Sequence, residues 1–468
     1  MCQLEKIGFL KHKSSCECKN SRLGIGLEKL DRSLYDPTNV YDPISQIGVK
    51  WVRIQSGWFK TEKQKGIYDF KWLDEIVDNI ISRGMTPWLC LCYGNELYTK
   101  NADNSTGSIP FAPINTQEEK TAWENYVAAC VEHYKGKISL YEIWNEPDIH
   151  CWYPSPNPKE YGEFCIATAK AIKKADSQAK IIGCAMGNWL SYWYEAFKTG
   201  MLDYVDFVSY HRYKVEVETC DKDFLISLKS LIKTFTDRDI KLIEGETGTQ
   251  SQRSPNGAVC NIDWDERKQA KYLLRILTYD IFTDVYIASY FSSVDIFENL
   301  KGAKISKEKS MYGFFGVLGE KFDENDMATG EYFKKPSYFA FQNLCSVFDG
   351  NETKTTFPFY FRTYDLNDID ASNEKSMVYK NSFQLNPSLK AIVYYKAADI
   401  LSDDFESTVS LVAMGLSKNI HLIDLMTGEV YKVSGEHIEI NDDIVAVKNV
   451  PIKDYPLLLT FGDISSLI

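Results

Sequence analysis

The stretch Tyr141-Glu142-Ile143-Trp144-Asn145-Glu146-Pro147-Asp148 has the pattern of a buried strand that ends in Asn-Glu-Pro. In a parallel α/β barrel, the last side chains of each strand lean over the carboxyl-terminal face, where such barrels hold their chemistry. Glu146 would then present a carboxylic acid at the barrel mouth, and Asn145 would present an amide to a substrate. The same residues also suit the start of a loop, because Asn favours turns and Pro blocks helix growth. The pattern on either side of the stretch decides between the two interpretations.

Strand-like apolar runs alternate with segments of helical period up to about residue 350. This alternation is typical of βα units on a parallel sheet. The strand candidates are residues 23–28, 51–55, 86–93, 139–145, 180–186, 207–213, 241–246 and 285–291. Eight strands are the number that closes a TIM barrel, and amphipathic helix candidates lie between them. The pattern therefore predicts an α/β fold, with a catalytic (β/α)8 TIM barrel over residues 21–350.

After residue 350 the pattern changes to short alternating strands separated by turn signals. The candidates are residues 388–395, 408–414, 420–424, 429–433, 437–440, 444–447 and 457–461. Antiparallel strands at this spacing are typical of a sandwich, so we expect a C-terminal antiparallel β-sandwich domain over residues 351–468. Residues 1–20 have the pattern of an N-terminal hairpin that can join this sandwich.

Composition limits the class of protein and of partner. The 468 residues carry a net charge of -12, with 25% charged and 44% hydrophobic residues, and no basic patch or long apolar run. These values exclude a membrane helix and argue against nucleic acid or an anionic membrane as partner. The N-terminus lacks the apolar core of a signal peptide, so we expect a cytoplasmic protein, or a secreted one whose signal was trimmed. The twelve scattered cysteines resemble small buried hydrophobes of a reduced protein, and the oligomeric state stays open.

A carboxylic acid beside an amide at a barrel mouth suits glycoside hydrolysis, which needs a second carboxyl group. One group protonates the leaving oxygen, while the other attacks the anomeric carbon or activates water. The seventh strand candidate ends in two acids, Glu244 and Glu246. Strand alternation places both on the same side, but Glu246 lies closer to the carboxyl edge. We therefore predict Glu246 as the second group; the alternative is that both acids are simply solvated at a strand end.

These motifs together resemble the retaining glycoside hydrolases of clan A. Trp144-Asn145-Glu146-Pro147 on the fourth strand and Gly245-Glu246-Thr247-Gly248 on the seventh are similar to the clan's acid/base and nucleophile segments. Val52-Arg53-Ile54 and Tyr210-His211-Arg212-Tyr213 are similar to its arginine and its His-x-Tyr on the second and sixth strands. The first strand, 23–28, and the trailing sandwich look most like family 39 and its unclassified relatives.

The resemblance implies a job for each matched residue. Glu146 would be the acid/base and Glu246 the nucleophile, and Arg53 would hold Glu246 ionised through charge and hydrogen bonding. Tyr213 would donate to the same carboxylate, with His211 near the acid or the sugar. Asn145 would bind the sugar 2-hydroxyl.

Further residues are predicted to bind the substrate by their place at strand ends. Glu28 ends the first strand and would bind hydroxyls of the terminal sugar, although a surface acid at a helix start has the same pattern. Trp152, Trp189 and Tyr290 fall at or after strand ends, where flat rings can stack on sugars, so we expect them to form pocket walls.

The sequence thus predicts a glycoside hydrolase that cleaves a β-glycosidic bond with retention, through a covalent glycosyl-enzyme. Long inserts after strands three, four and eight favour a pocket and exo action. The resemblance to family 39 implies β-xyloside-like or β-glucoside-like plant-type saccharides as substrates. The alternative is an inactive, lectin-like carbohydrate-binding barrel. Six histidines without a ligand cluster and no phosphate-binding glycine loop predict neither a metal nor another cofactor. Retention predicts carboxyl groups roughly 5 to 5.5 Å apart, and inversion a wider gap.

Overall fold

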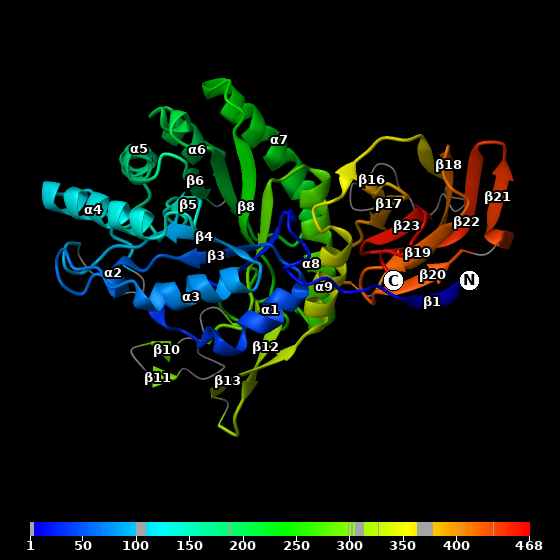
Figure 1. Ribbon diagram of the computed structural model, residues 1–468, viewed down its shortest axis with the longest axis horizontal. Coiled ribbons are helices and arrows are strands. Elements are labelled where there is room, and N and C mark those ends of the chain that lie inside the picture. The colour runs from blue at the N-terminus through cyan, green and yellow to red at the C-terminus, as the bar shows by residue number, and fades with distance from the viewer. Residues whose placement is uncertain are drawn as a thin grey trace.

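A computed structural model describes most of the chain. The described residues are 4–99, 109–186, 189–297, 299–300, 303–304, 313–325, 327–362, 378–402, 404–433 and 435–468. They form a closed barrel on one side of the molecule and two antiparallel sheets on the other, with α8 and α9 between them (Figure 1).

The barrel is built from eight parallel strands, each paired with the next in chain order, and the first with the last. The strands are β2 (Leu23–Gly26), β3 (Trp51–Gln55), β4 (Thr86–Leu91), β5 (Leu140–Ile143), β6 (Lys180–Met186), β7 (Phe207–Arg212), β8 (Lys241–Thr247) and β9 (Ile287–Tyr290). The helices are α1 (Tyr41–Ile47), α2 (Trp58–Thr61), α3 (Lys71–Ser82), α4 (Gln117–His133), α5 (Pro158–Ala175), α6 (Leu190–Phe197), α7 (Val217–Phe235), α8 (Glu266–Phe282) and α9 (Pro336–Val347). The predicted (β/α)8 barrel is confirmed.

Local sequence signals explain where several of these helices begin. Thr116, Asn157 and Asp265 each accept a hydrogen bond from a backbone N–H in the first turn of α4, α5 and α8. Such caps satisfy donors that the helix itself leaves free. One face of α4 is buried, with Trp123, Tyr126, Val127 and Cys130 among its apolar residues. A separate apolar cluster fills the inside of the barrel: Trp88, Leu140, Ile182, Phe207, Ile243 and Ile287.

The second unit is a sandwich of a seven-stranded and a four-stranded antiparallel sheet. The larger sheet has the order β1 (Glu5–Phe9), β20 (Glu429–Lys432), β19 (Ile420–Asp424), β23 (Leu457–Gly462), β17 (Leu389–Lys396), β16 (Val378–Asn386) and β14 (Thr353–Lys354). The smaller sheet has the order β15 (Phe359–Arg362), β18 (Glu406–Met414), β22 (Ile444–Lys453) and β21 (Ile438–Asn441). The predicted antiparallel character of the C-terminal part is confirmed.

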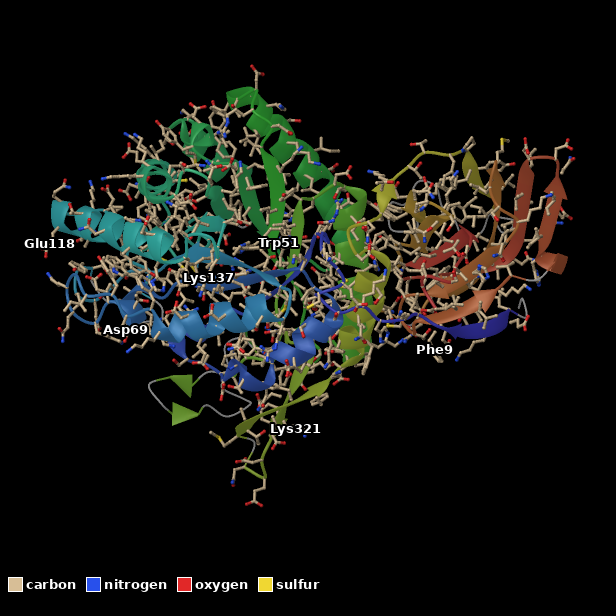
Figure 2. The ribbon with its side chains drawn as sticks, in the orientation of Figure 1. Phe9, Trp51, Asp69, Glu118, Lys137 and Lys321 are labelled. Atoms are coloured by element: carbon tan, nitrogen blue, oxygen red, sulfur yellow. The ribbon has the colours of Figure 1, made fainter. Side chains whose placement is uncertain are left out.

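The N-terminal segment differs from the expected hairpin. Its described residues form a single strand, β1, and the partner of β1 is β20, more than 400 residues later in the chain. Phe9 accordingly lies at the sandwich side of the molecule (Figure 2). A hairpin pattern cannot distinguish a local partner from a distant one, because both leave the same alternation in the sequence.

The barrel and the sandwich meet through buried ion pairs and rings on α8. Arg275 forms a two-pronged ion pair with Glu218 of α7 and donates to the backbone carbonyl of Ala398 at 2.8 Å. Lys271 pairs with Asp454 at 2.7 Å, and the Phe282 ring stacks on Phe383. The helix that follows β8 is therefore tied to the sandwich.

Two small antiparallel pairs occupy the long connection after β9. They are β10 (Asn299–Leu300) with β11 (Ala303–Lys304), and β12 (Leu318–Phe322) with β13 (Ala328–Lys334). Lys321 lies near the tip of the second pair, which projects away from the barrel (Figure 2). Buried Lys335 contacts Asp295 and Ser251, each at 2.7 Å, and so fixes the base of this connection.

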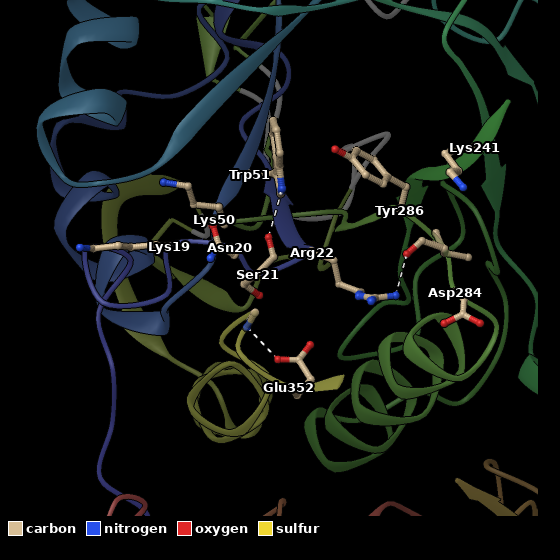
Figure 3. Close-up of a pocket in the computed structure, with 12 residues that line it drawn as sticks. Lys19, Asn20, Ser21, Arg22, Lys50, Trp51, Lys241, Asp284, Tyr286 and Glu352 are labelled. Atoms are coloured by element: carbon tan, nitrogen blue, oxygen red, sulfur yellow. Dashed lines mark hydrogen bonds between the residues drawn. The ribbon is translucent and has the colours of Figure 1, made fainter. Parts of the chain in front are cut away.

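A cavity of about 490 Å³ opens at the amino-terminal ends of the barrel strands. Trp51 and Tyr286 face each other across it, and Arg22 donates to the carbonyl of Val285 below them (Figure 3). These residues stand at or just before strand starts, on the rim opposite the strand ends that carry the acids. Active sites of TIM barrels lie at the carboxyl-terminal ends of the strands, so this cavity is not the expected active site.

Among the described helices, none combines the length and the apolar character needed to cross a membrane.

Candidate active site

The end of β5 leaves the barrel through an unusual backbone turn. Trp144 and Glu146 have φ angles of 66° and 42°, in the left-handed region that residues with a side chain rarely adopt. The indole of Trp144 donates to the carbonyl of Cys151 at 2.8 Å, which holds the turn. Such strained positions persist where surrounding contacts impose them, and they gather at functional sites. Here the turn directs Asn145 and Glu146 to the barrel mouth.

Glu146 is paired with a histidine from β7. His211 Nδ1 lies 2.8 Å from Glu146 Oε1. Burial lowers the pKa of His211, but the charges of Glu246 and Glu146 and the hydrogen bond to Glu146 outweigh it, so the net shift is upward. The upward shift favours a protonated imidazole in contact with the Glu146 carboxyl group at the mouth of the site.

Glu246 ends β8 and lies beside His211, its neighbour in the register of β7 and β8. Arg53 Nη1 donates to its Oε1, and the Tyr213 hydroxyl donates to its Oε2 at 2.8 Å. Burial would raise the pKa of Glu246, but the charges of His211, Arg53 and Lys29 and the hydrogen bond from Tyr213 lower it to about 2. Glu246 is thus ionised across the whole neutral and mildly acidic range.

The close approach of β7 and β8 depends on a glycine. A Cβ on Gly245 would lie 2.8 Å from His211 Nε2 and 2.4 Å from Ser209 Oγ. Only a residue without a side chain fits between these atoms, so Gly245 lets the nucleophile strand pass next to His211. Glu244, the other candidate acid, is fully buried in the strand.

Arg53 of β3 is the hub beneath both acids. The whole side chain is buried. Its Nε contacts Glu142 Oε2 at 2.6 Å, and its Nη2 donates to Asn145 Oδ1 at 2.8 Å. Asn145 Nδ2 in turn donates to the Tyr93 hydroxyl at 2.9 Å. Asn145 is therefore held at both ends of its amide, next to the two candidate acids.

The acids and the histidine lie close together. One side-chain atom each from Glu146, His211 and Glu246 lie within 4.8 Å of one another. Among the described residues, these three also form the group whose ligand types suit a metal ion, but the Arg53 guanidinium in contact with Glu246 opposes a cation there. The arrangement offers one strongly ionised carboxylate, Glu246, close to a second carboxyl group, Glu146, which is hydrogen-bonded to His211. That combination suits general acid catalysis with a nucleophile.

The structure brings together Asn145, Glu146, Glu246, Arg53, His211 and Tyr213, as the sequence predicted. Trp189 caps the start of α6 and its ring is 62% exposed, as a rim residue would be.

Three other predicted substrate contacts are placed differently. Trp152 is 1% exposed and packs edge-on against Trp144, and Tyr290 is fully buried against Phe341, so both rings belong to the core and not to a pocket wall. Glu28 is 1% exposed and lies beneath the site beside Arg53, not in its opening. Proximity to a strand end was the only signal for these residues, and it does not tell which way the following loop turns a side chain.

Sequence reasoning missed three residues of the site. Tyr93 binds Asn145, and the Cys151 thiol lies 4.0 Å from Glu146 Oε2; burial raises the pKa of this thiol to about 12. Lys29 has a left-handed backbone with a φ of 74°, and its charge helps to lower the pKa of Glu246. Tyr93 lay within a predicted strand and Lys29 directly follows Glu28, so their position at strand ends was the available signal.

Comparison with known proteins gives consistent results. The family model "Glycosyl hydrolases family 39" matches residues 38–356. A protein named Beta-xylosidase from Caldicellulosiruptor saccharolyticus is 23% identical over 363 residues, 71% of this chain and 68% of that protein. A Beta-xylosidase from Geobacillus stearothermophilus is 24% identical over 161 residues, 32% of each chain.

Solved structures share the fold. A family 39 glycoside hydrolase from Bacteroides cellulosilyticus WH2 superposes with a TM-score of 0.66 and 16% identity, over 95% of this chain and 82% of that one. A GH39 β-xylosidase from Caulobacter crescentus superposes with a TM-score of 0.57 and 16% identity, over 97% and 98% of the two chains.

Proposed function

Because the chain belongs to glycosyl hydrolase family 39 and is a glycosidase of clan A, we propose that it cleaves β-xyloside-like bonds with retention, using Glu146 as acid/base and Glu246 as nucleophile. The observation that carries this proposal is the short gap between Glu146 and Glu246, whose nearest oxygen atoms lie within 4.8 Å. Inverting enzymes need roughly 6.5 to 9.5 Å between the two groups, to fit a water molecule. A gap of this size favours direct attack by a carboxylate.

In the first step Glu146, whose Oε1 lies 2.8 Å from His211 Nδ1, gives its proton to the leaving oxygen. Glu246 is ionised, since its pKa is about 2, and attacks the anomeric carbon from the other side of the sugar. The Tyr213 hydroxyl and Arg53 hold the Glu246 carboxylate in position for this attack. The product is a glycosyl ester on Glu246.

In the second step Glu146 acts as a base. Esterification removes the charge of Glu246, so Glu146 can hold a negative charge and take a proton from the attacking water. Asn145 binds the sugar 2-hydroxyl, and its amide is fixed by Arg53 and Tyr93 at 2.8 and 2.9 Å. A contact held this firmly tightens in the oxocarbenium-like transition state without further ordering.

The substrate class rests on the relatives. Two relatives carry the name Beta-xylosidase, and a neighbouring structure is described as a β-xylosidase. We extend this to an exo-acting enzyme on β-xyloside-like or β-glucoside-like plant-type saccharides, with Trp189 at the rim for the aglycone. A lectin-like protein without activity would be expected to have lost part of the acid pair, and both glutamates and Arg53 are in place.

Turnover of a panel of nitrophenyl glycosides tests this proposal. We expect release of nitrophenol from the β-xyloside, and the first-formed sugar should be the β-anomer by proton NMR. Glu246→Ala should lower kcat by about 10⁴-fold or more, while azide should restore turnover in Glu146→Ala as a β-glycosyl azide. Glu62→Gln is the matched control, because Glu62 is also buried but contacts Trp58 and Tyr98 away from the site.

An α-anomeric first product would contradict retention. Wild-type turnover that survives Glu246→Ala would contradict the assignment of the nucleophile. Tight binding of a xylo-oligosaccharide without turnover of any panel member would favour the lectin alternative.

A further inference from the structure

One nitrogen of Arg53 faces two carboxyl groups. Nη1 donates to Glu246 and also lies 3.3 Å from Glu28 Oε1. The other two nitrogens of the guanidinium have their own acceptors: Nε donates to Glu142 and Nη2 donates to Asn145. The Glu28 contact is thus the longest of the three carboxylate contacts of this guanidinium.

Glu28 reaches this place because the strand beneath it lacks a side chain. A Cβ on Gly26 would lie 1.9 Å from Glu28 Oε2. The carboxyl group folds back into that space, and among the described residues Oε2 has no hydrogen-bond partner. With 1% exposure, Glu28 is buried beside Arg53, which it shares with Glu246.

Acids outnumber the cations that act directly on Glu28. Glu28, Glu142 and Glu246 all contact Arg53, and the cations that act on Glu28 are Arg53 and Lys29, whereas the charge of His211 acts on Glu246. Burying a charge is costly, and Glu28 has the longest of the three contacts with Arg53, so Glu28 is the acid most readily protonated. Tyr35 and Tyr213 also face Glu28, and both stay neutral because burial and nearby acids raise their pKa far above the usual value.

The titration of the two acids agrees with this count. Burial first and then the charge of Glu246 raise the pKa of Glu28 to about 7, against the opposing charges of Arg53 and Lys29. The pKa of Glu246 is about 2. In mildly acidic solution the resting enzyme therefore has a protonated Glu28 next to an ionised Glu246.

On the basis of the proposed function, we propose that Glu28 compensates the charge of the nucleophile: Glu28 and Glu246 share one negative charge on Arg53, and Glu28 gives up its proton when Glu246 becomes an ester. Glu28 is a positioning residue, because it is buried at 1% exposure and shares the Arg53 guanidinium with Glu246.

The proton balance follows the two steps. When the Glu246 oxygen bonds to the anomeric carbon, the glycosidic bond breaks and the leaving oxygen takes the proton of Glu146. The ester is neutral, so Glu28 releases its proton to solvent and its carboxylate takes over the Arg53 contact. When water attacks the ester, Glu146 takes the water's proton, the Glu246 carboxylate returns, and Glu28 recovers a proton from solvent. The charge around Arg53 is the same in both states.

Infrared difference titration of the substrate-free protein tests the shared charge. In wild type, the carbonyl band of a buried carboxylic acid should disappear as the pH rises through neutrality, and the band should be missing in Glu28→Gln. Glu246→Gln removes the neighbouring charge as the ester does, and it should lower the midpoint of this band by about one to three pH units. Glu146→Gln is the matched control: Glu146 bonds to His211 and not to Arg53, so the midpoint should stay in place.

Three outcomes would overturn the proposal. They are a wild-type spectrum without the band, a band that persists in Glu28→Gln, and an unchanged midpoint in Glu246→Gln. None of these measurements requires turnover, so they separate a failure of the shared charge from a failure of the proposed glycosidase activity.

Covalent trapping gives a second test, with a 2-deoxy-2-fluoro β-xyloside and a pH indicator. Roughly one pH unit below the Glu28 midpoint, wild type should release about one proton more per trapped site than Glu28→Gln. The difference cancels the contribution of Glu146, which is present in both proteins. Equal release would contradict the proposal.

Discussion

Two buried arginines of this molecule have opposite surroundings. Arg275, between the barrel and the sandwich, meets one carboxylate in a two-pronged pair with Glu218, at 2.8 and 2.6 Å, and a backbone carbonyl at 2.8 Å. Arg53, under the acids, meets three carboxylates and one amide. The first guanidinium is balanced by its partner, whereas the second is shared.

The difference indicates what each cluster is for. A balanced buried pair fixes one geometry, and apolar residues of similar volume can often replace it. A shared guanidinium leaves its acids with unequal affinities for protons, as the pKa values of about 2 for Glu246 and about 7 for Glu28 illustrate. Unequal acids on one cation are the arrangement that catalysis requires. Four predictions test how far this contrast holds.

The largest effect is expected at Arg53. Arg53→Met leaves buried Glu142 without its cation and releases Glu246 and Asn145, so kcat should fall by about 10³-fold or more. The free energy of unfolding should drop by about 3 to 5 kcal/mol. Turnover of the nitrophenyl xyloside and urea denaturation measure the two effects. A near wild-type kcat in Arg53→Met would show that Arg53 is not needed for catalysis.

The Arg275 pair should respond differently to single and double substitution. Arg275→Met alone strands the Glu218 charge and should cost about 3 to 5 kcal/mol of unfolding free energy. The double variant Arg275→Met/Glu218→Leu should regain most of the lost unfolding free energy. The kcat of the single variant and of the double variant should both stay close to wild type. Denaturant unfolding and steady-state kinetics check this. Loss of activity in the double variant would show that the barrel–sandwich interface is coupled to the active site. The Arg275 pair would then not be purely structural, in contrast to our interpretation.

Tyr213→Phe should have an intermediate effect through the nucleophile. The Tyr213 hydroxyl favours the ionised form of Glu246, so its loss raises the pKa of Glu246 above about 2. The depressed pKa contributes stability that is present above the unfolded pKa of Glu and fades as the pH falls toward 2; in the variant this contribution should be smaller, and its loss should be complete at a higher pH. The acid limb of the kcat/KM profile should move up likewise, with a loss of about 10-fold in kcat/KM.

Tyr210→Phe is the matched control for this substitution. Tyr210 lies on the same strand, β7, but its hydroxyl is 3.4 Å from Asp280 of α8. The acid limb should stay in place in this variant. Equal shifts in the two variants would mean that strand stability, and not the contact with Glu246, sets the acid limb.

The smallest effect is expected at the rim. Trp189→Ala removes an exposed ring that we propose for the aglycone side of the rim, so KM should rise a few-fold for an aryl xyloside while kcat changes little. The same variant should leave the KM of a small alkyl xyloside unchanged. A fall in kcat would place Trp189 nearer to the reacting sugar.

Much of the site could be predicted because strand ends in a barrel are fixed by chain order. Asn145, Glu146, Arg53 and Glu246 fall on strands whose number and period were clear from the sequence, so their convergence followed. Tyr290 was placed wrongly because its strand end packs outward against Phe341, which belongs to α9 and lies far away in the chain.

The remaining misses have a similar cause. Lys29 and Tyr93 enter the site through the loop backbone, which the strand pattern does not specify. In the sandwich, β15 and β16 escaped prediction although β17, the neighbour of β16, was found. β15 has only four residues, and β16 contains polar residues such as Lys380, Asn381 and Gln384, so neither strand carries a clear apolar alternation.

The pairing of β1 with β20 has a consequence for how the protein is made. Phe9 pairs with Glu429, and 429 minus 9 is 420 residues of chain. At the usual 5 to 20 residues per second, a ribosome needs about 20 to 80 seconds to supply the partner of β1. All barrel strands have emerged by then, so the nascent barrel waits with α8 uncovered and β1 unpaired. We therefore expect the sandwich to close last, after synthesis of β20. A chain truncated before β20 would be released with an unpaired sheet edge, which chaperones and proteases can bind.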